Sequence, residues 1–276
     1  MKIAFVSSMN KSLYDFYGKR FLEEFAKSAS QEILLFIIFE GKYPEEILTI
    51  GENIIVVPLM SESHSLFLNK FGKLEEAKGL KIKKITENGQ KKLSLSYDFR
   101  FNAIRFSFKP FSIHQCLEYL PNDITHLIWT DADLRCKKKF NSDDLIDFLP
   151  HKSEIMSYLG RKDSYSECGF LGFNMCEKNT LDYIGRMIEI YTSGDIFSLD
   201  QWHDSFIWDH VRLEFESKLN CKFKDISGDG AEKEHVYINT NLNEYFDHLK
   251  GPERKQLGSS KPEDYERGII NTIKVK

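Results

Sequence analysis

His126-Leu127-Ile128-Trp129-Thr130-Asp131-Ala132-Asp133 is the stretch of sequence that decides the fold. Its apolar run is typical of a buried strand, and the run ends at two carboxylates separated by one residue. Ligands of α/β sheets bind at the carboxyl ends of the strands, so we expect Asp131 and Asp133 to serve chemistry rather than folding. Two carboxylates at this place suit Mg²⁺ or Mn²⁺ carrying a diphosphate.

The sequence before this stretch alternates between strand and helix patterns. Residues 3–6, 33–39 and 54–59 read as buried strands, residues 14–29 as an amphipathic helix and residues 66–77 as a second helix. Such β-α-β alternation predicts an α/β fold with a mostly parallel central sheet flanked by helices. The length of 276 residues fits one such domain.

The composition is that of a globular protein, with 41% hydrophobic and 29% charged residues, and it excludes the disordered and fibrous classes. The net charge of -4 gives the whole molecule no general attraction for nucleic acid or anionic membrane. Five cysteines without a C-x-x-C pair predict neither a disulfide framework nor a zinc site. The short apolar start and the absence of a long apolar run predict a cytoplasmic protein.

A lysine-rich segment precedes the central stretch. Residues 78–92 contain six lysines against one acid, Glu87, and residues 93–101 alternate with period two as a half-buried strand or an extended arm would. One interpretation is a solvated hairpin that turns around Asn88-Gly89. The other is a basic flap for a polyanionic acceptor such as DNA or a phosphorylated glycan.

Pro110 stands where a helix could begin, with apolar residues at helical spacing behind it and an end at residues 121–123. Arg105 and Lys109 then fall at or just before the helix N-terminus. Backbone N–H groups and the helix dipole favour an anion there, and the two cations would strengthen that preference.

Three later segments contain candidate functional residues. Glu167-Cys168-Gly169-Phe170-Leu171-Gly172-Phe173-Asn174 has two glycines in an apolar run, which indicate a bulge or a close backbone approach. Asp200-Gln201-Trp202-His203-Asp204-Ser205 is a polar cluster before an amphipathic helix, where Asp200 alone could be an N-cap. His248-Leu249-Lys250-Gly251-Pro252-Glu253-Arg254-Lys255 joins a histidine to a Gly-Pro turn and several cations.

With these segments the chain resembles the GT-A glycosyltransferases, especially the retaining, Mn²⁺-dependent, nucleotide-sugar enzymes of the glycogenin and bacterial galactosyltransferase kind. Those families carry an apolar strand ending in Asp-x-Asp, then Asn-x-Gly-x-x-x-x-Asn, then Asp-Gln, and finally His-x-x-Gly-x-x-Lys. The order is the same here, over most of the chain, and the matching residues are Asp131 and Asp133, Gly169 and Asn174, Asp200 and Gln201, and His248, Gly251 and Arg254.

The resemblance implies a single GT-A-like (Rossmann-like) domain, with a nucleotide-binding half over about 1–135 and a sugar and acceptor half over about 136–276. It also implies a metal site of Asp131, Asp133 and His248 that neutralises the leaving diphosphate, since metal-bound charge favours bond cleavage. The donor would be a nucleoside diphosphate sugar, and the expected donor is a UDP-sugar. Its expected contacts are Arg105, Lys109, Gly169, Asp200, Gln201, Lys250, Gly251, Arg254 and Lys255.

Two departures from the family pattern concern the donor. Glu167 replaces the first Asn of the second segment, so it changes how the sugar is held or supplies a carboxylate near the anomeric carbon. Arg254-Lys255 replaces a Lys-Pro-Trp ending, which keeps a phosphate contact because Arg binds phosphate bidentately.

Asp204 and Glu167 are the candidate catalytic carboxylates. Either could stabilise an oxocarbenium-like centre, accept the acceptor's proton, or attack to form a covalent intermediate. Trp202 could pack on a sugar face or in the core. The glycine-rich segment 227–232 is a candidate mobile lid.

The prediction is therefore glycosyl transfer with retention, to a glycan or lipid-linked saccharide. A second acceptor class is DNA with hydroxylated bases. A metal-dependent nucleotidyltransferase is the rival enzyme class, although Ser7-Ser8-Met9-Asn10 is not the glycine-rich phosphate loop that it needs. A non-catalytic binding module is the third alternative.

Overall fold

The computed structural model describes residues 1–87, 90–266 and 268, with the backbone alone described for 82–87 and 90–93. A seven-stranded sheet has the order β10-β8-β9-β6-β1-β2-β3. Its strands are β1 (Ile3–Asn10), β2 (Leu34–Glu40), β3 (Ile54–Pro58), β6 (His126–Thr130), β8 (Glu154–Arg161), β9 (Ser164–Asn174) and β10 (Lys222–Asp225).

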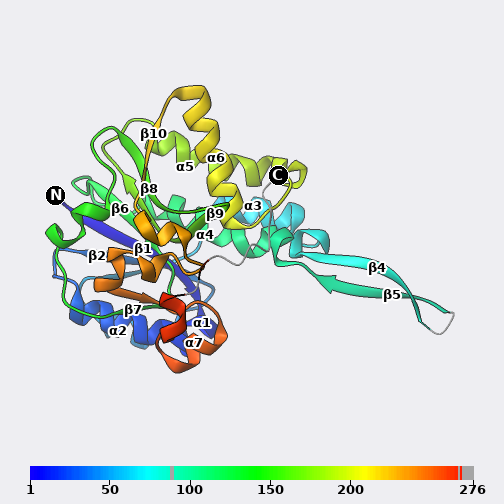
Figure 1. The fold of residues 1–276 in the computed structure, drawn as a ribbon, viewed down its shortest axis with the longest axis horizontal. Helices are drawn as coiled ribbons and strands as arrows, with labels where there is room; N and C mark the ends of the chain where they lie inside the picture. The colour runs from blue at the N-terminus through cyan, green and yellow to red at the C-terminus, as the bar shows by residue number, and fades with distance from the viewer. Residues whose placement is uncertain (88–89, 267, 269–276) are drawn as a thin grey trace.

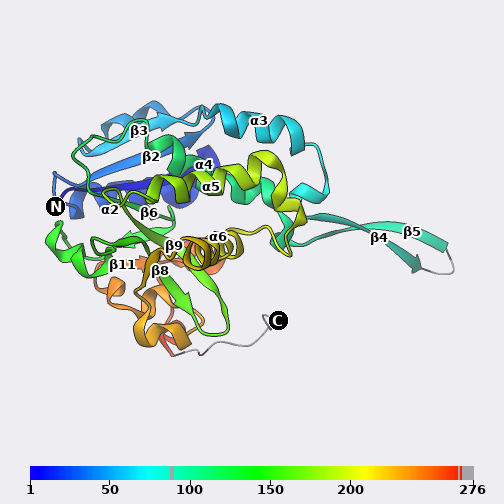
Figure 2. The ribbon, with the colours of Figure 1, turned by 90° about the horizontal axis from the view of Figure 1, so that it is seen from above.

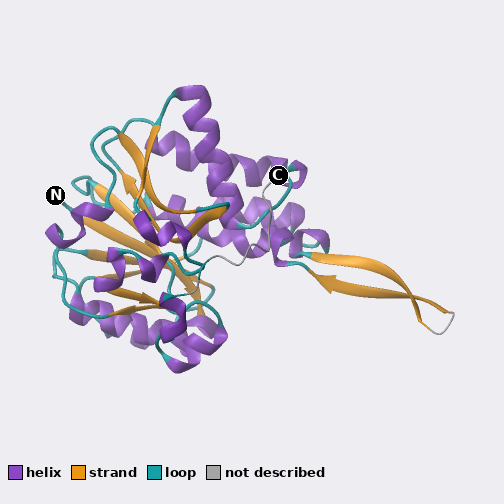
Figure 3. Ribbon diagram, in the orientation of Figure 1, coloured by secondary structure: helices purple, strands orange, loops and turns teal. Residues whose placement is uncertain are grey.

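The sheet is mostly parallel. Strand β1 pairs in parallel with β2 and β6, β2 with β3, and β10 with β8, while β9 runs antiparallel between β6 and β8. This arrangement confirms the predicted α/β fold. Helices lie on both sides of the sheet (Figure 3).

The helices are α1 (Lys11–Leu13), α2 (Lys19–Ser28), α3 (Glu62–Phe71), α4 (Ala103–Cys116), α5 (Thr180–Ser193), α6 (Asp204–Leu219) and α7 (Pro252–Leu257). A wide π turn at Tyr14–Gly18 joins α1 to α2, so the predicted first helix runs almost continuously from Lys11 to Ser28. Short 3-10 helices supply much of the remaining chain, including Glu45–Thr49, Glu76–Lys78, Phe99–Phe101, Asp143–Phe148, Asp195–Ser198, Gly228–Glu232, Tyr237–Asn239, Asn241–Glu244 and Pro262–Tyr265.

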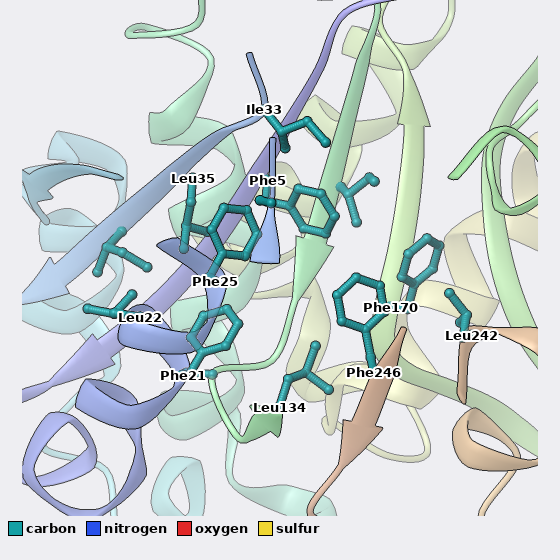
Figure 4. Close-up of a cluster of buried hydrophobic side chains, with 14 of the residues drawn as sticks. Phe5, Phe21, Leu22, Phe25, Ile33, Leu35, Leu134, Phe170, Leu242 and Phe246 are labelled. Atoms are coloured by element: carbon teal, nitrogen blue, oxygen red, sulfur yellow. The ribbon is translucent and has the colours of Figure 1, made fainter. Parts of the chain in front are cut away.

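Each face of the sheet buries its own apolar core, because alternate residues of a strand point to opposite faces. In β1, Phe5 packs toward α2 and the C-terminal 3-10 segments (Figure 4), whereas Val6 packs toward α3, α4, α5 and α6. Both faces of the inner strands are covered, so their sequences are almost continuously apolar.

Two small ladders lie outside the main sheet. The strands β7 (Leu134–Cys136) and β11 (Phe246–His248) pair antiparallel, and β4 (Leu80–Glu87) and β5 (Gln90–Tyr97) form a hairpin that projects from the body (Figures 1 and 2). The hairpin pairing from Leu80–Tyr97 to Glu87–Gln90 confirms the predicted hairpin, and the turn itself, Asn88-Gly89, lies outside the described residues.

The prediction that a helix begins at Pro110 is wrong. Helix α4 begins at Ala103, because the side chain of Asn102 caps it by accepting a hydrogen bond from the backbone N–H of Arg105 at 2.9 Å. It ends at Cys116, before the predicted end. Pro110 lies inside the helix, where it removes one backbone donor. Arg105 therefore lies in the first turn as expected, but Lys109 lies in the middle of the helix and is buried.

All five cysteines are free. Within the described residues, no helix has the length and apolar character needed to cross a membrane.

Candidate functional site

The site forms where β6 ends. Asp131 and Asp133 lie in the turn between β6 and β7, and backbone bonds fix this turn from two sides: Asp131 N–H donates to Gly169 O at 3.1 Å, and Leu249 N–H donates to Asp133 O at 3.0 Å. The β7–β11 ladder pairs His248 with Leu134. This register places the histidine beside a carboxylate 115 positions earlier in the sequence.

One ligand atom from each of Asp131, Asp133 and His248 lies within 4.8 Å of the other two. We call these three residues the metal cluster. The Nε2 atom of His248 is 3.3 Å from Asp133 Oδ1 and 3.9 Å from Asp131 Oδ2. The structure therefore brings together the three residues predicted as metal ligands.

Gly169 makes room for this arrangement. A Cβ atom on Gly169 would lie 2.9 Å from Cε1 of the His248 ring, closer than carbon atoms approach without displacement. The close backbone approach predicted from the sequence is thus an approach to the histidine. Gly172 is similarly constrained on the same strand, where a Cβ would meet Ser157 Oγ at 2.5 Å.

The two carboxylates divide their oxygens between the histidine and two lysines. Asp131 Oδ1 lies 3.1 Å from Lys109 Nζ and accepts a 2.9 Å bond from the Trp129 indole, and Asp133 Oδ2 lies 2.7 Å from Lys255 Nζ. The other oxygens, Asp131 Oδ2 and Asp133 Oδ1, face His248. Lysine and indole partners orient the carboxylates without occupying the oxygens that a cation would use.

Asp133 Oδ1 and His248 Nδ1 are buried without a hydrogen-bond partner among the described residues. A buried unpaired acceptor is costly, and a cation between Asp133 Oδ1, Asp131 Oδ2 and His248 Nε2 would satisfy the carboxylate oxygen. Carboxylate oxygens and one imidazole are donors that Mn²⁺ and Mg²⁺ accept. The residues therefore fit a divalent metal.

The electrostatics of the metal cluster are those of a crowded buried site. Burial opposes the charge on His248, but Asp133, Glu167 and Asp131 outweigh it and raise the pKa of the imidazole. Burial also raises the pKa of Asp131, with Lys109 offsetting only part of it. For Asp133, His248 and Lys255 overcome burial and lower the pKa of the carboxyl.

Lys109 connects the metal cluster to Asp204, the first residue of α6. Its ammonium lies 3.1 Å from Asp131, 2.7 Å from Asp204 Oδ2, and donates to Cys168 O at 2.7 Å, with only 10% of its side chain exposed. Burial opposes this charge, yet Asp131 and Asp204 raise the pKa of Lys109. For Asp204 itself, Lys109 overcomes burial and lowers the pKa, so the carboxylate is ionised at neutral pH.

Glu167 is ionised for a similar reason. It is buried, with Lys250 Nζ at 2.9 Å and an Arg161 guanidinium nitrogen at 3.8 Å. These cations and His248 overcome burial and hold its pKa well below the usual range. Lys250 is thus bound to a carboxylate next to the metal cluster.

The Asp200 segment lies beside the site and not at the metal cluster. Asp200 is exposed, and the N-cap of α6 is His203, whose Nδ1 accepts from Phe206 N–H at 3.4 Å, so the N-cap interpretation of Asp200 is wrong. Gln201 contacts His203 Nε2 at 2.9 Å.

The other predicted residues lie in several places. Arg254 forms a salt bridge through its guanidinium to buried Asp264, whereas its neighbour Lys255 reaches Asp133. Gly251, with a φ of +86°, opens α7 at the cavity wall. The predicted lid is a 3-10 helix that contacts the β8–β9 turn, where Lys162 N–H donates to Ala231 O at 2.9 Å.

A cavity of about 830 Å³ opens in front of the metal cluster. Its walls include residues predicted from the sequence (Arg105, Lys109, Asp131, Asp133, Asp204, Gly251 and Lys255) and residues that were not predicted (Ser8, Asn10, Phe16, Tyr17 and Glu40). Burial raises the pKa of Glu40 to about 7, against hydrogen bonds from Asn10 and Ser8. Asn10 and Glu40 end β1 and β2, so a correct extension of the two predicted strands would have found them.

The fold and the site together define an α/β protein that carries a candidate divalent-cation cluster and a large, partly charged cavity at the carboxyl edge of its sheet. No protein family model matches this chain, and none of the curated proteins matches it.

Two similar solved structures are of sugar-transferring enzymes. The apo crystal structure of mouse xyloside xylosyltransferase 1 is 11% identical, with a TM-score of 0.46 over 82% of this chain and 85% of that one. The apo form of the glycosyltransferase GlyE of Streptococcus pneumoniae TIGR4 is 12% identical, with a TM-score of 0.45 over 83% of this chain and 46% of that one, so this chain spans less than half of its length. At such values the likenesses assign no activity to this chain.

Proposed function

We propose that this protein is a metal-dependent glycosyltransferase that moves a sugar from a nucleoside diphosphate sugar, most simply a UDP-sugar, to a hydroxyl acceptor. The observation that carries the proposal is the metal cluster at the wall of an 830 Å³ cavity that cationic side chains also line. Such a cavity suits a nucleotide sugar, whose anionic diphosphate lies between an uncharged nucleoside and an uncharged sugar.

Asp131, Asp133 and His248 would hold Mn²⁺ or Mg²⁺ through the three atoms that face one another. An ion bound there would supply positive charge that favours departure of the diphosphate. Lys255, from α7, and Arg105, from the first turn of α4, line the same cavity and add charge-assisted contacts to phosphate oxygens. Lys109 holds Asp131 and Asp204 in place, so it acts by positioning them.

Asp204 is the catalytic carboxylate that the geometry favours. It lines the cavity, whereas Glu167, which Lys250 and Arg161 bind, is not among the residues of the cavity wall. Its lowered pKa keeps it ionised, which suits stabilisation of positive charge at an anomeric carbon and excludes a role as a general acid at neutral pH. With this carboxylate facing the sugar we propose retention, and Glu167 would orient Lys250.

Two acceptor classes are compatible with this proposal, a saccharide or lipid-linked glycan and DNA with hydroxylated bases. The nucleotidyltransferase alternative is less well supported, because Ser7 to Asn10 continue strand β1 directly into α1 and leave no phosphate loop there. The division of the chain into a nucleotide half and a sugar half also belongs to the proposal, with Ser8, Asn10 and Glu40 at the nucleotide end.

A thermal-shift screen of nucleotide sugars with and without Mn²⁺ tests the proposal, because a ligand that binds the folded state raises its melting temperature. We expect one donor to stabilise the protein only when Mn²⁺ is present, and to be hydrolysed slowly. Asp133→Asn should abolish both effects, and Asp195→Asn, an exposed site away from the cavity, should abolish neither. A protein that binds no nucleotide sugar under these conditions would rule the proposal out.

A further inference from the structure

The hairpin of β4 and β5, residues 80–97, is the largest feature of the fold that the proposed function leaves without a role. We call it the arm. It leaves the body and extends away from it (Figures 1 and 2). Its strands are paired over eight positions, from Leu80–Tyr97 to Glu87–Gln90. At about 3.4 Å per residue this ladder is about 27 Å long.

The charge of the arm is opposite to that of the rest of the chain. Residues 80–97 contain five lysines and one acid, a net charge of +4, so with -4 for the whole chain the remainder carries -8. A polyanion would therefore be attracted to the arm and repelled by the body. Long-range attraction of this kind confines contact to the arm and orients the ligand.

The positions of the lysines along the strands favour a nucleic acid over a flat anionic membrane as the ligand of the arm. Lys83-Lys84 and Lys91-Lys92 are consecutive pairs within β4 and β5. Consecutive positions of a strand belong to opposite faces, so each pair contributes one position to each face of the arm. A flat membrane would meet one face, whereas the walls of a nucleic-acid groove carry phosphates on both sides. A two-stranded ribbon fits the major groove of duplex DNA, which is about 12 Å wide.

The base of the arm is joined to the wall of the cavity. Directly after β5, Arg100 O accepts a 2.7 Å bond from Trp202 N–H, and the Phe101 and Trp202 rings pack edge to face at 5.1 Å. Phe99 contacts His203 at 5.9 Å between ring centroids. His203 caps α6, whose first residue, Asp204, lines the cavity. The base of the arm therefore adjoins the element that carries the proposed catalytic carboxylate.

We propose that the arm binds duplex DNA as a ribbon in its major groove and thereby holds DNA beside the cavity. Because it names DNA as the carrier of the acceptor hydroxyl in place of a glycan, this inference rests on the proposed function for its catalytic meaning. The binding itself does not depend on donor, metal or transfer.

The test is the salt dependence of binding to a fluorescent 30-base-pair duplex, measured by anisotropy with the full chain. If the arm neutralises about five phosphates, affinity falls by ~500-fold between 50 and 200 mM monovalent salt. A Lys84→Ser/Lys91→Ser/Lys92→Ser variant leaves two lysines, Lys81 and Lys83, on the arm. We expect it to bind more weakly at 50 mM salt and to lose only ~10-fold over the same range.

The matched control removes the same charge from the body, at the exposed run Lys137, Lys138 and Lys139. Replacing these three lysines by serine should leave most of the affinity and the steep salt dependence in place. Both variants should keep the thermal shift that donor and Mn²⁺ produce, which separates loss of the arm's role from loss of the donor site. Equal losses in the two triple variants, or arm-dependent binding to phosphatidylglycerol vesicles without binding to DNA, would overturn the inference.

Discussion

Removing the ammonium group of Lys109 should strongly destabilise the protein although its apolar core is unchanged. Lys109→Met keeps the apolar stem and removes an ammonium that lies between Asp131 at 3.1 Å and Asp204 at 2.7 Å. Breaking a buried ion pair from one side costs about 3–5 kcal/mol, because the remaining charge stays buried without a partner. Two carboxylates and the carbonyl of Cys168 lose their partner here, so we expect the upper part of that range.

Equilibrium unfolding in urea measures this loss, and its pH dependence tests the cause. The pKa of Asp204 is lowered in the folded state, so the stability that its pairing contributes is present above about pH 4, the unfolded value, and is lost as pH falls through the folded value. The raised pKa of Lys109 contributes stability below about pH 10 that is lost at higher pH. The difference between wild type and variant should therefore be largest between about pH 5 and 9.

Lys138→Met is the control, since Lys138 is exposed and pairs with exposed Glu244 at 3.0 Å. It should change the free energy of unfolding little, because exposed ion pairs contribute little. If Lys109→Met cost no more than Lys138→Met, or if its effect persisted unchanged at pH 2, the account of Lys109 as a buried bridge would be refuted.

Three further predictions concern the cavity. Gly169→Ala should displace His248 and weaken Mn²⁺ binding at least tenfold, as loss of the groups that support metal ligands typically does. In the control Gly185→Ala the added Cβ meets no atom within 4 Å, so this variant should bind Mn²⁺ as wild type does in calorimetric titration. Glu40→Gln should become progressively more stable than wild type as pH rises from about 4 to 7, because burial raises the carboxyl pKa to about 7 and wild type must then bury a charge; parallel curves would contradict this. Lys255→Ala should weaken donor binding, measured by thermal shift, more than Arg254→Ala does, because Lys255 lines the cavity and Arg254 is bound to Asp264. A larger loss in Arg254→Ala would show instead that Arg254 contacts the phosphates.

The sequence predicts the part of the site that rests on local patterns. The apolar run before Asp131 marks a buried strand, and strand ends in such sheets gather ligands, so the position of both carboxylates could be predicted. His248 required the resemblance as well, because only the β7–β11 ladder brings it to Asp133. No local pattern reports a contact between segments so far apart.

Other features could not be predicted because tertiary contacts overrule local signals. Ser7, Ser8 and Asn10 are polar, yet they extend β1 because the neighbouring strand β2 pairs with them along its whole length. Pro110 marks a helix start by preference, but the cap at Asn102 places it inside the helix. Lys109 is a surface residue by type, and only the meeting of α4 with β6 and α6 explains why it is buried.

The three-residue ladder between β7 and β11 has a consequence for how the chain closes on itself. A cation held by Asp131, Asp133 and His248 would join two points 115 positions apart, as a crosslink does, and would do so reversibly. Removing the ion should then loosen the part of the chain that follows β10 first, while the main sheet stays intact. Limited proteolysis would then show cleavage after β10 only when a chelator is present. The same experiment would therefore report both whether the metal site is occupied and whether the segment after β10 is folded.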